Sequence, residues 1–257
     1  MKSLIKNSSR PILLILLFLG AQLNGATSRS EVKLLEASED IKLISQQVVK
    51  DYFYLSQNRK EEVEAKLQKG VLALDEKLRL IAAATKSDDT KNILTFLAFS
   101  RDQMSETIAL PYDTENGALM LDYSETLLEG AESIANEHVY QFSEEEQMLI
   151  NVKKMAYLIE RITKYYMAFQ VGFNDHNNVK QLQSAIASFN KELVKLNAYE
   201  YRGESAEDLA TINHYWPIAK KFYLTLEKRE LPNILYISAG HLESVIGKLE
   251  LYHSKNQ

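Results

Sequence analysis

The strongest constraint on the fold of this chain is an internal duplication. Residues 42–52 match residues 156–166, so that Lys50 aligns with Lys164, 114 positions later. Farther along, residues 67–81 match a segment at an offset of 115, and a Leu-Glu pair near the end of each copy matches at 114. Two helical stretches can be aligned by chance, but several segments at nearly one offset predict two copies of one structural unit.

Each copy contains four stretches with apolar residues at alternating spacings of four and three, which is typical of amphipathic helices. Glycine and proline are few, and alanine, leucine, glutamate and lysine dominate these stretches. The sequence therefore predicts an all-α fold of two tandem up-down four-helix bundles, over residues 27–142 and 143–257. We expect the helices at residues 30–56, 61–84, 88–110, 115–142, 143–172, 178–196, 209–226 and 232–252.

Helix boundaries are marked by caps and prolines. Ser143 with Glu146 forms a capping-box pattern, although one continuous helix from Glu115 to Gly172 could also join the two bundles. Ser205, three residues before Asp208, predicts another cap.

Two prolines give further boundary signals. Pro217 should kink or split the seventh helix, because proline cannot donate the backbone hydrogen bond. Pro232 fits the first turn of the last helix, where no such bond is needed.

The N-terminus has the pattern of a secretory signal peptide. Positively charged residues precede a short apolar run, residues 11–19, and small residues follow it, so we expect cleavage near Ala26. The alternative is an uncleaved anchor. No later apolar run is long enough to span a bilayer, so we expect a periplasmic chain that does not cross the membrane after cleavage.

Charge and cysteine content exclude several classes of function. Removal of residues 1–26 takes away Lys2, Lys6 and Arg10 and no acid, which changes the formal net charge from −5 to −8. That sign argues against a nucleic-acid partner. The absence of cysteine excludes disulfides and thiolate metal sites.

Residues 42–50 resemble the signature of PilJ-type sensor domains, the N-terminal helical domains of type IV pilus methyl-accepting chemotaxis transducers. Residues 156–164 are a weaker second match, and Trp216 resembles a position in the third helix of that family. The resemblance implies a tandem input module without an output domain. In nitrate-sensing relatives an arginine binds the anion, and its position is occupied here by Lys42 in the first copy and Ala156 in the second.

The two copies differ in the polarity of their first helix. Ser38 and Ser45 stand where the second copy has Val152 and Ile159. Two hydroxyls one heptad apart on an apolar seam need partners, either a polar pocket or the carbonyls of their own helix.

If a pocket forms, the first copy is the expected place for a ligand. The candidate ligand-binding residues all lie on its first helix: Ser38, Lys42, Ser45, Gln46 and Lys50.

No pattern predicts an enzyme, a cofactor or a metal site. The five histidines are too far apart to pair on one helix, and the segment Gly240-His241-Leu242-Glu243 lacks the His-x-x-Glu spacing of imelysin-like proteins. No catalytic triad order or phosphate-binding glycine loop is present.

The leading functional prediction is binding of a small ligand or docking on a membrane receptor, as a chemotaxis-type or pilus-type input. Two alternatives stay open: a structural or interaction protein of the envelope without a ligand, and a metal or haem carrier. A homodimer is compatible with each of them.

Overall fold

The computed structural model describes the backbone of residues 10–58, 60–138, 141–226 and 231–256, and side chains from residue 31 onward. The predicted signal peptide, residues 1–26, lies outside the residues whose side chains are described. The described backbone forms eight α-helices and no strand, which confirms the predicted all-helical class. The helices are α1 (Arg10–Gln57), α2 (Glu61–Ala84), α3 (Asp88–Thr107), α4 (Thr114–Glu137), α5 (Glu144–Gln170), α6 (His176–Ala198), α7 (Glu204–Tyr223) and α8 (Pro232–Lys255).

The link between α4 and α5 corrects one expectation. A continuous helix from Glu115 to Gly172 does not form, because α4 ends at Glu137 and α5 begins anew at Glu144. The capping box is present instead: the Glu146 N–H donates to Ser143 Oγ (3.2 Å), and the Ser143 N–H donates to the Glu146 carboxylate (2.8 Å). Two otherwise unpaired N–H groups are satisfied in this way, so a new helix starts here.

The start of α7 corrects a second expectation. Ser205 lies inside the helix and does not cap it, because the chain turns at Gly203, whose φ of +57° is accessible to glycine at little cost. Pro217 does not end α7, which continues to Tyr223. Pro232 occupies the first turn of α8, as predicted.

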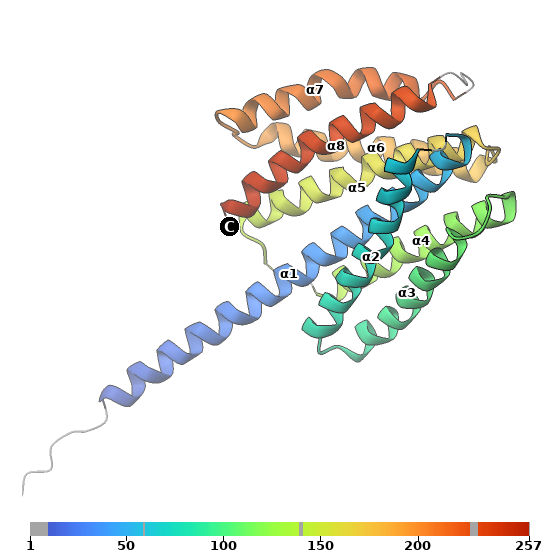
Figure 1. The fold of residues 1–257 in the computed structure, drawn as a ribbon. Coiled ribbons are helices and arrows are strands. Elements are labelled where there is room, and N and C mark those ends of the chain that lie inside the picture. Colours follow the sequence, from blue (N-terminus) through green and yellow to red (C-terminus); the bar gives the residue numbers. More distant parts are fainter. Residues whose placement is uncertain (1–9, 59, 139–140, 227–230, 257) are drawn as a thin grey trace, which may run out of the picture.

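The two opening helices lie at the centre of the molecule. We call α1–α4 the first repeat and α5–α8 the second repeat. α1 packs against α2, α4 and α5, while α5 packs against α6 and α8; α3 and α7 cover α4 and α8 from outside. The repeats therefore lie side by side, with the contact between α1 and α5 as their common core (Figure 1).

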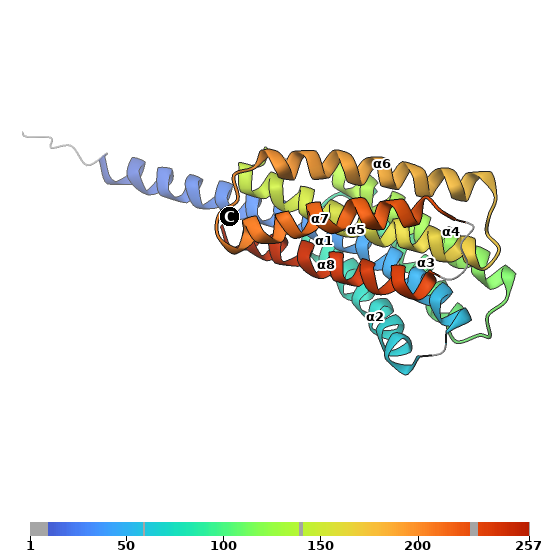
Figure 2. The same ribbon diagram turned by 90° about the horizontal axis from the view of Figure 1, so that it is seen from above.

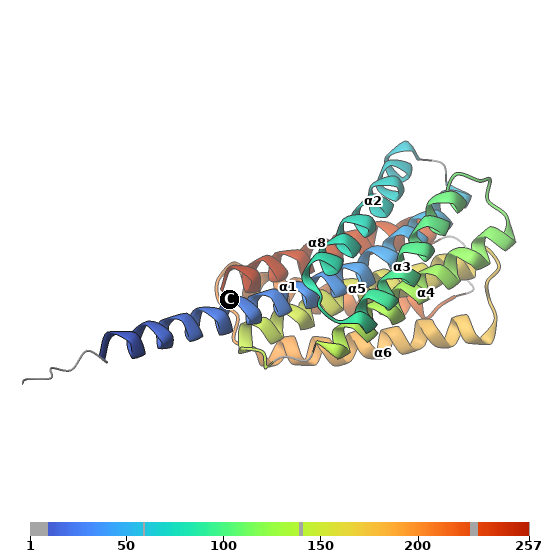
Figure 3. The same cartoon turned by 90° about the horizontal axis from the view of Figure 1, so that it is seen from below.

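α2 and α8 lie on the same side of this central pair. Figures 2 and 3, seen from above and below, place α2 and α8 along one edge and α6 along the opposite edge. α2 belongs to the first repeat and α8 to the second, so this edge is shared between the two repeats. The N-terminal part of α1 extends beyond the repeats in all three views.

The last helices of the two repeats, α4 and α8, align at an offset of 115 positions when their buried residues are matched. Five buried positions of α4 then coincide with five buried positions of α8, whereas the offset of 114 suggested by the Leu-Glu pairs places several of them on exposed residues. The coinciding residues are Met120, Ser124, Leu127, Ala131 and Ile134 in α4, and Leu235, Ala239, Leu242, Ile246 and Leu249 in α8. In this alignment Glu125 of α4 corresponds to Gly240 of α8.

Among the residues whose side chains are described, no helix is long and apolar enough to cross a membrane. One continuous cluster of buried apolar side chains runs through both repeats.

Candidate functional site

A groove of about 390 Å³ lies between α1, α2 and α8, and we call it the α1–α2–α8 groove. This volume is within the range of small-ligand pockets, roughly 300–1,000 Å³. α1 forms its floor, while α2 of the first repeat and α8 of the second form its walls. The lining residues are Ile44, Gln47, Val48, Lys50, Asp51, Lys66, Lys69, Gly70, Ala73, Tyr236, Gly240 and Glu243.

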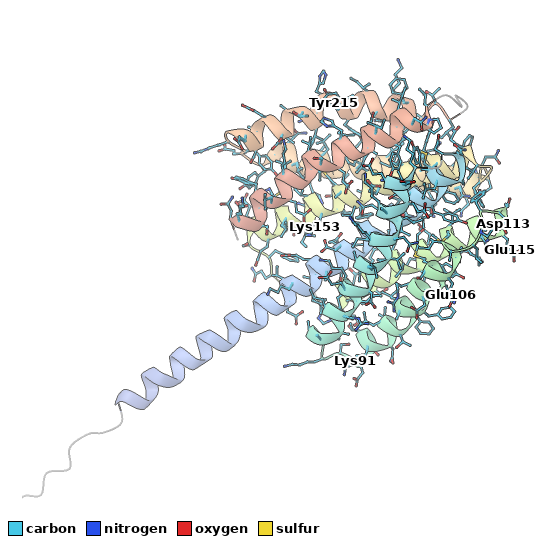
Figure 4. All side chains as sticks on the ribbon, viewed as in Figure 1. Lys91, Glu106, Asp113, Glu115, Lys153 and Tyr215 are labelled. Carbon is cyan, nitrogen blue, oxygen red and sulfur yellow. The ribbon has the colours of Figure 1, made fainter. Side chains whose placement is uncertain are left out.

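A chain of ion pairs bridges from α2 to α8 beyond one end of the groove. Asp40 of α1 accepts from Lys77 of α2 (2.8 Å) and from Lys153 of α5 (2.6 Å), and Lys153 also reaches Glu250 of α8 (2.8 Å). Figure 4 shows Lys153 at this meeting point of the helices. These four charged side chains connect α2 and α8 to the central helices α1 and α5, and they close this end of the groove.

Aromatic packing borders the other end. The rings of Tyr54 and Tyr236 stack with centroids 3.9 Å apart, and the Tyr54 hydroxyl donates to Asn233 (2.8 Å). The Tyr236 hydroxyl donates to Asp51 (2.7 Å) in the groove itself. α8 is therefore fixed to α1 by hydrogen bonds and ring contacts here.

Lys50 supplies a buried positive charge at the floor. Its Nζ lies 2.6 Å from Glu160 of α5 and 3.5 Å from Asp51, and 4.8 Å from the centre of the Tyr236 ring. Burial alone would lower the pKa of Lys50, but the carboxylates of Glu160 and Asp51 raise it well above its ordinary value. Lys50 is therefore charged at every physiological pH.

Glu160 lies behind Lys50 and has no exposed surface. Burial raises the pKa of Glu160 to about 7, the Glu243 carboxylate adds to this rise, and Lys50 opposes it. The side-chain amide of Gln47 donates to Glu243. A carboxyl group with a pKa raised to about 7 thus lies directly behind the floor of the groove.

The α2 wall adds two further cations. Lys66 is mostly exposed and lies 3.9 Å from Glu62, a distance at which an exposed pair contributes little. Lys69 has no ion-pair partner among the described residues. Gly240 forms the facing wall, and a Cβ placed there would meet no atom within 4 Å.

The corresponding place lies between α5 and α6 of the second repeat and α4 of the first, and side chains fill it; we call it the α4–α5–α6 site. Arg161 of α5 donates to both oxygens of Glu125 (3.0 and 2.6 Å) and to Gln181 of α6 (3.0 Å). Lys164 donates to the same Glu125 carboxylate (2.6 Å) and to Ser124 (2.9 Å). These contacts join α4, α5 and α6, as the groove residues would join α8, α1 and α2.

The buried cluster shifts the pKa values of its members in opposite directions. Burial would raise the pKa of Glu125, but Lys164 and Arg161 lower it to about 2. Burial lowers the pKa of Lys164 to about 8, although Glu125 opposes this. The Glu125 carboxylate is therefore permanently ionised and held by two cations.

The five residues predicted for a ligand site do not meet in one cavity. Ser38 Oγ donates to the Leu34 carbonyl and Ser45 Oγ to the Lys42 carbonyl, both at 3.0 Å, so the hydroxyls are satisfied by their own helix. The amide of Gln46 donates to Ser45 Oγ (3.1 Å) and to the Ser124 carbonyl of α4 (3.3 Å). None of these three side chains lines the α1–α2–α8 groove.

Lys42 and Lys50 open onto different cavities. Lys42 pairs with Glu39 at 2.5 Å and lies 5.2 Å from the centre of the Tyr157 ring. It borders a cavity of about 310 Å³ between α1, α4, α5 and α6, whose other lysines, Lys154 and Lys195, both pair with Glu192. Lys50 is the predicted residue that reaches the α1–α2–α8 groove.

Sequence reasoning missed the residues that α2 and α8 contribute. Lys66 and Lys69 lie on an exposed face, and Gly240 and Glu243 come from the other repeat. A comparison of Gly240 with Glu125 would have indicated the difference, but it needs the offset of 115 that burial reveals.

Metal chemistry finds no support in the described part of the chain, where no group of three or more histidine, aspartate or glutamate side chains could hold an ion. Comparisons with protein-family models, with curated proteins and with solved structures gave no match.

Proposed function

We propose that this protein binds a small molecule in the α1–α2–α8 groove and acts as a sensor-like input module in the periplasm. The observation that supports this most is the difference between the repeats. Arg161, Glu125 and Gln181 close the α4–α5–α6 site, whereas the α1–α2–α8 groove leaves an open space with Lys50 at its floor. A duplicated unit that keeps one site filled and one open has room for a ligand in only one of them.

The resemblance of residues 42–50 to PilJ-type signatures supports the sensory part of the proposal. This segment of α1 forms the floor of the groove on one face and packs against α5 on the other. A ligand that draws α2 and α8 together would change the surface shared by the two repeats, which a membrane receptor could detect. Export through the predicted signal peptide would place the protein where such receptors expose their sensing domains.

A matched pair of glycine substitutions on α8 tests the binding function. Gly240→Leu fills the groove, whereas Gly247→Leu adds the same side chain where a Cβ also meets no atom within 4 Å. A thermal-shift screen of the native protein against anions, amino acids and other metabolites should yield a compound that raises the melting midpoint by mass action.

Gly240→Leu should abolish that rise and Gly247→Leu should preserve it. Equal responses of the two variants, or no response of the native protein to any compound, would refute binding in the groove.

Exposed apolar side chains favour docking on another protein as a second candidate. Tyr215 and Ile218 of α7 and Ile234 and Ile237 of α8 are exposed on neighbouring helices. Figure 4 shows Tyr215 on α7, and its ring lies 5.2 Å from that of His241 on α8. Substitution of Ile218 and Ile237 by serine should weaken capture of a receptor domain without affecting ligand binding, if this surface is used.

A further inference from the structure

We infer that the ligand of the α1–α2–α8 groove carries a carboxylate, which takes the place that Glu125 occupies in the α4–α5–α6 site. This inference rests on the proposed binding function and adds the chemical class of the ligand. It follows from a position-by-position comparison of the two repeats. In the filled site a glutamate of the protein itself occupies the position that is open in the groove.

Four positions define the filled α4–α5–α6 site, and all four counterparts line the groove. Arg161 and Lys164 correspond to Gln47 and Lys50 at an offset of 114, which brings every buried position of residues 48–54 onto a buried position of α5. Gln181 corresponds to Lys66 at the offset of 115 that aligns α2 with α6. Glu125 corresponds to Gly240.

The groove has two cations and has no carboxylate at the position of Glu125. In the α4–α5–α6 site Lys164 and Arg161 hold Glu125; in the groove Lys50 takes the place of Lys164, and Lys66 takes the place of Gln181. An ammonium group has three donors; Glu160 lies 2.6 Å from Lys50 Nζ and Asp51 lies 3.5 Å from it. One donor of Lys50 is therefore left for a ligand.

The acids of the groove already have donors of their own. Asp51 accepts from Tyr236, and Glu243 accepts from Gln47. Each of these carboxylates thus has a hydrogen-bond donor, although Glu243 has no ion-pair partner among the described residues. Lys69 at the rim also has no ion-pair partner among the described residues, so the α2 wall offers an ammonium group to a ligand carboxylate.

The rest of the lining sets the size and polarity of the ligand. Ile44, Val48 and Ala73 give an apolar stretch beside the lysines, and the volume of about 390 Å³ suits a molecule the size of a small amino acid or a short branched acid. The inferred ligand is a carboxylate with a short apolar tail.

A carboxylate tethered to α8 tests the inference even while the natural ligand is unidentified. Gly240→Glu restores the group found at Glu125, and Gly240→Gln has the same size without the charge. The same two changes at Gly247 provide the control, because glutamate and glutamine have nearly equal helix propensities.

At low salt, Gly240→Glu should melt roughly 2 °C above Gly240→Gln, beyond any difference between the two Gly247 variants. High salt should reduce this gain. A Gly240→Glu protein no more stable than Gly240→Gln would show that the acids Asp51, Glu243 and Glu160 dominate the groove, and would overturn the inference.

Three probes of similar shape identify the ligand group. Isocaproate carries the carboxylate alone, leucine carries both charges, and isoamylamine carries the ammonium alone. Isocaproate or leucine at millimolar concentration should raise the melting midpoint, with roughly tenfold or greater loss of affinity in Gly240→Glu, and isoamylamine should not.

Binding of isocaproate alone would identify a simple acid, and binding of leucine alone would identify an amino acid whose ammonium meets Asp51 or Glu243. Binding of isoamylamine but neither carboxylate, lost in Gly240→Leu, would overturn the inference and leave the proposed binding function intact. Absence of carboxylate binding in every variant would overturn the inference, while the wider screen decides the function.

Discussion

Lys50 shows how a single buried charge is held between the two repeats. Its ammonium lies 2.6 Å from Glu160, and neither side chain has more than slight contact with solvent. Breaking such a pair on one side typically costs about 3–5 kcal/mol, because the remaining charge stays buried and unpaired. The Lys50–Glu160 contact therefore fixes the alignment of α1 against α5 at the level of the groove.

The raised pKa of Glu160 should make the stability of the protein fall as the pH rises. The pKa of this carboxyl is raised to about 7 in the folded protein, above its ordinary value of 4.5. The folded state then binds more protons than the unfolded chain between these values. The stability that Glu160 contributes is present below about pH 4.5 and is lost as the pH rises to about 7.

Glu160→Gln should remove this part of the pH dependence. Between about pH 5 and 8 the unfolding free energy of the native protein should fall relative to that of the variant, by an amount on the order of 1–3 kcal/mol. Urea unfolding at a series of pH values measures it. Glu129→Gln, at an exposed position of α4, is the control and should keep the native slope. A Glu160→Gln protein with that same slope would show that Glu160 does not titrate in this range.

At the scale of the helices, Gly70 allows α2 to approach α1 closely beside the groove. A Cβ at this position would come within 2.6 Å of Val48 Cγ2, and Val48 is buried and stiff because it is branched at Cβ. Gly247 of α8 is the natural comparison, since a Cβ there meets no atom within 4 Å. One glycine is needed for packing and the other is not.

Substitution by alanine should separate these two positions. Gly247→Ala should stabilise the protein by about 0.5–1 kcal/mol through helix propensity. Gly70→Ala gains the same propensity but overpacks the contact, at a cost of about 1–3 kcal/mol, so it should be no more stable than the native protein. Chemical denaturation measures both, and equal gains at the two positions would contradict the close approach of α2.

The helices themselves were largely predictable from local signals. α2 has the predicted bounds, Ser87 caps α3, and Ser143 with Glu146 caps α5, because these signals act within a few residues of the chain. The prediction of Ser205 as a cap was wrong, because α7 begins at Glu204, directly after Gly203 with its positive φ. The sequence alone does not show which of Gly203 and Ser205 precedes the helix, since this depends on the backbone conformation.

At the scale of the whole molecule, the duplication predicted two related halves but not how they meet. Apolar periodicity describes one helix at a time, so it could not show that α1 and α5 form a shared core or that side chains of α8 contact α1. Lys50 was predicted for a ligand site because it lies close to Ser38 and Ser45 on one helix, and it is the predicted residue that lines the groove. Ser38 and Ser45 themselves interrupt the apolar seam, but their hydroxyls are satisfied within α1.

The asymmetry between the repeats is the central claim, and backbone amide chemical shifts of the native protein with a bound ligand test it most directly. The largest changes should fall on Gly70 and Gly240, which wall the groove. The amide shifts of their counterparts in the α4–α5–α6 site, Ala185 and Glu125, should not change, because Glu125, Arg161 and Lys164 already fill that site. Equal changes at both sets, or changes confined to the cavity beside Lys42, would contradict the claim that the α1–α2–α8 groove holds the ligand.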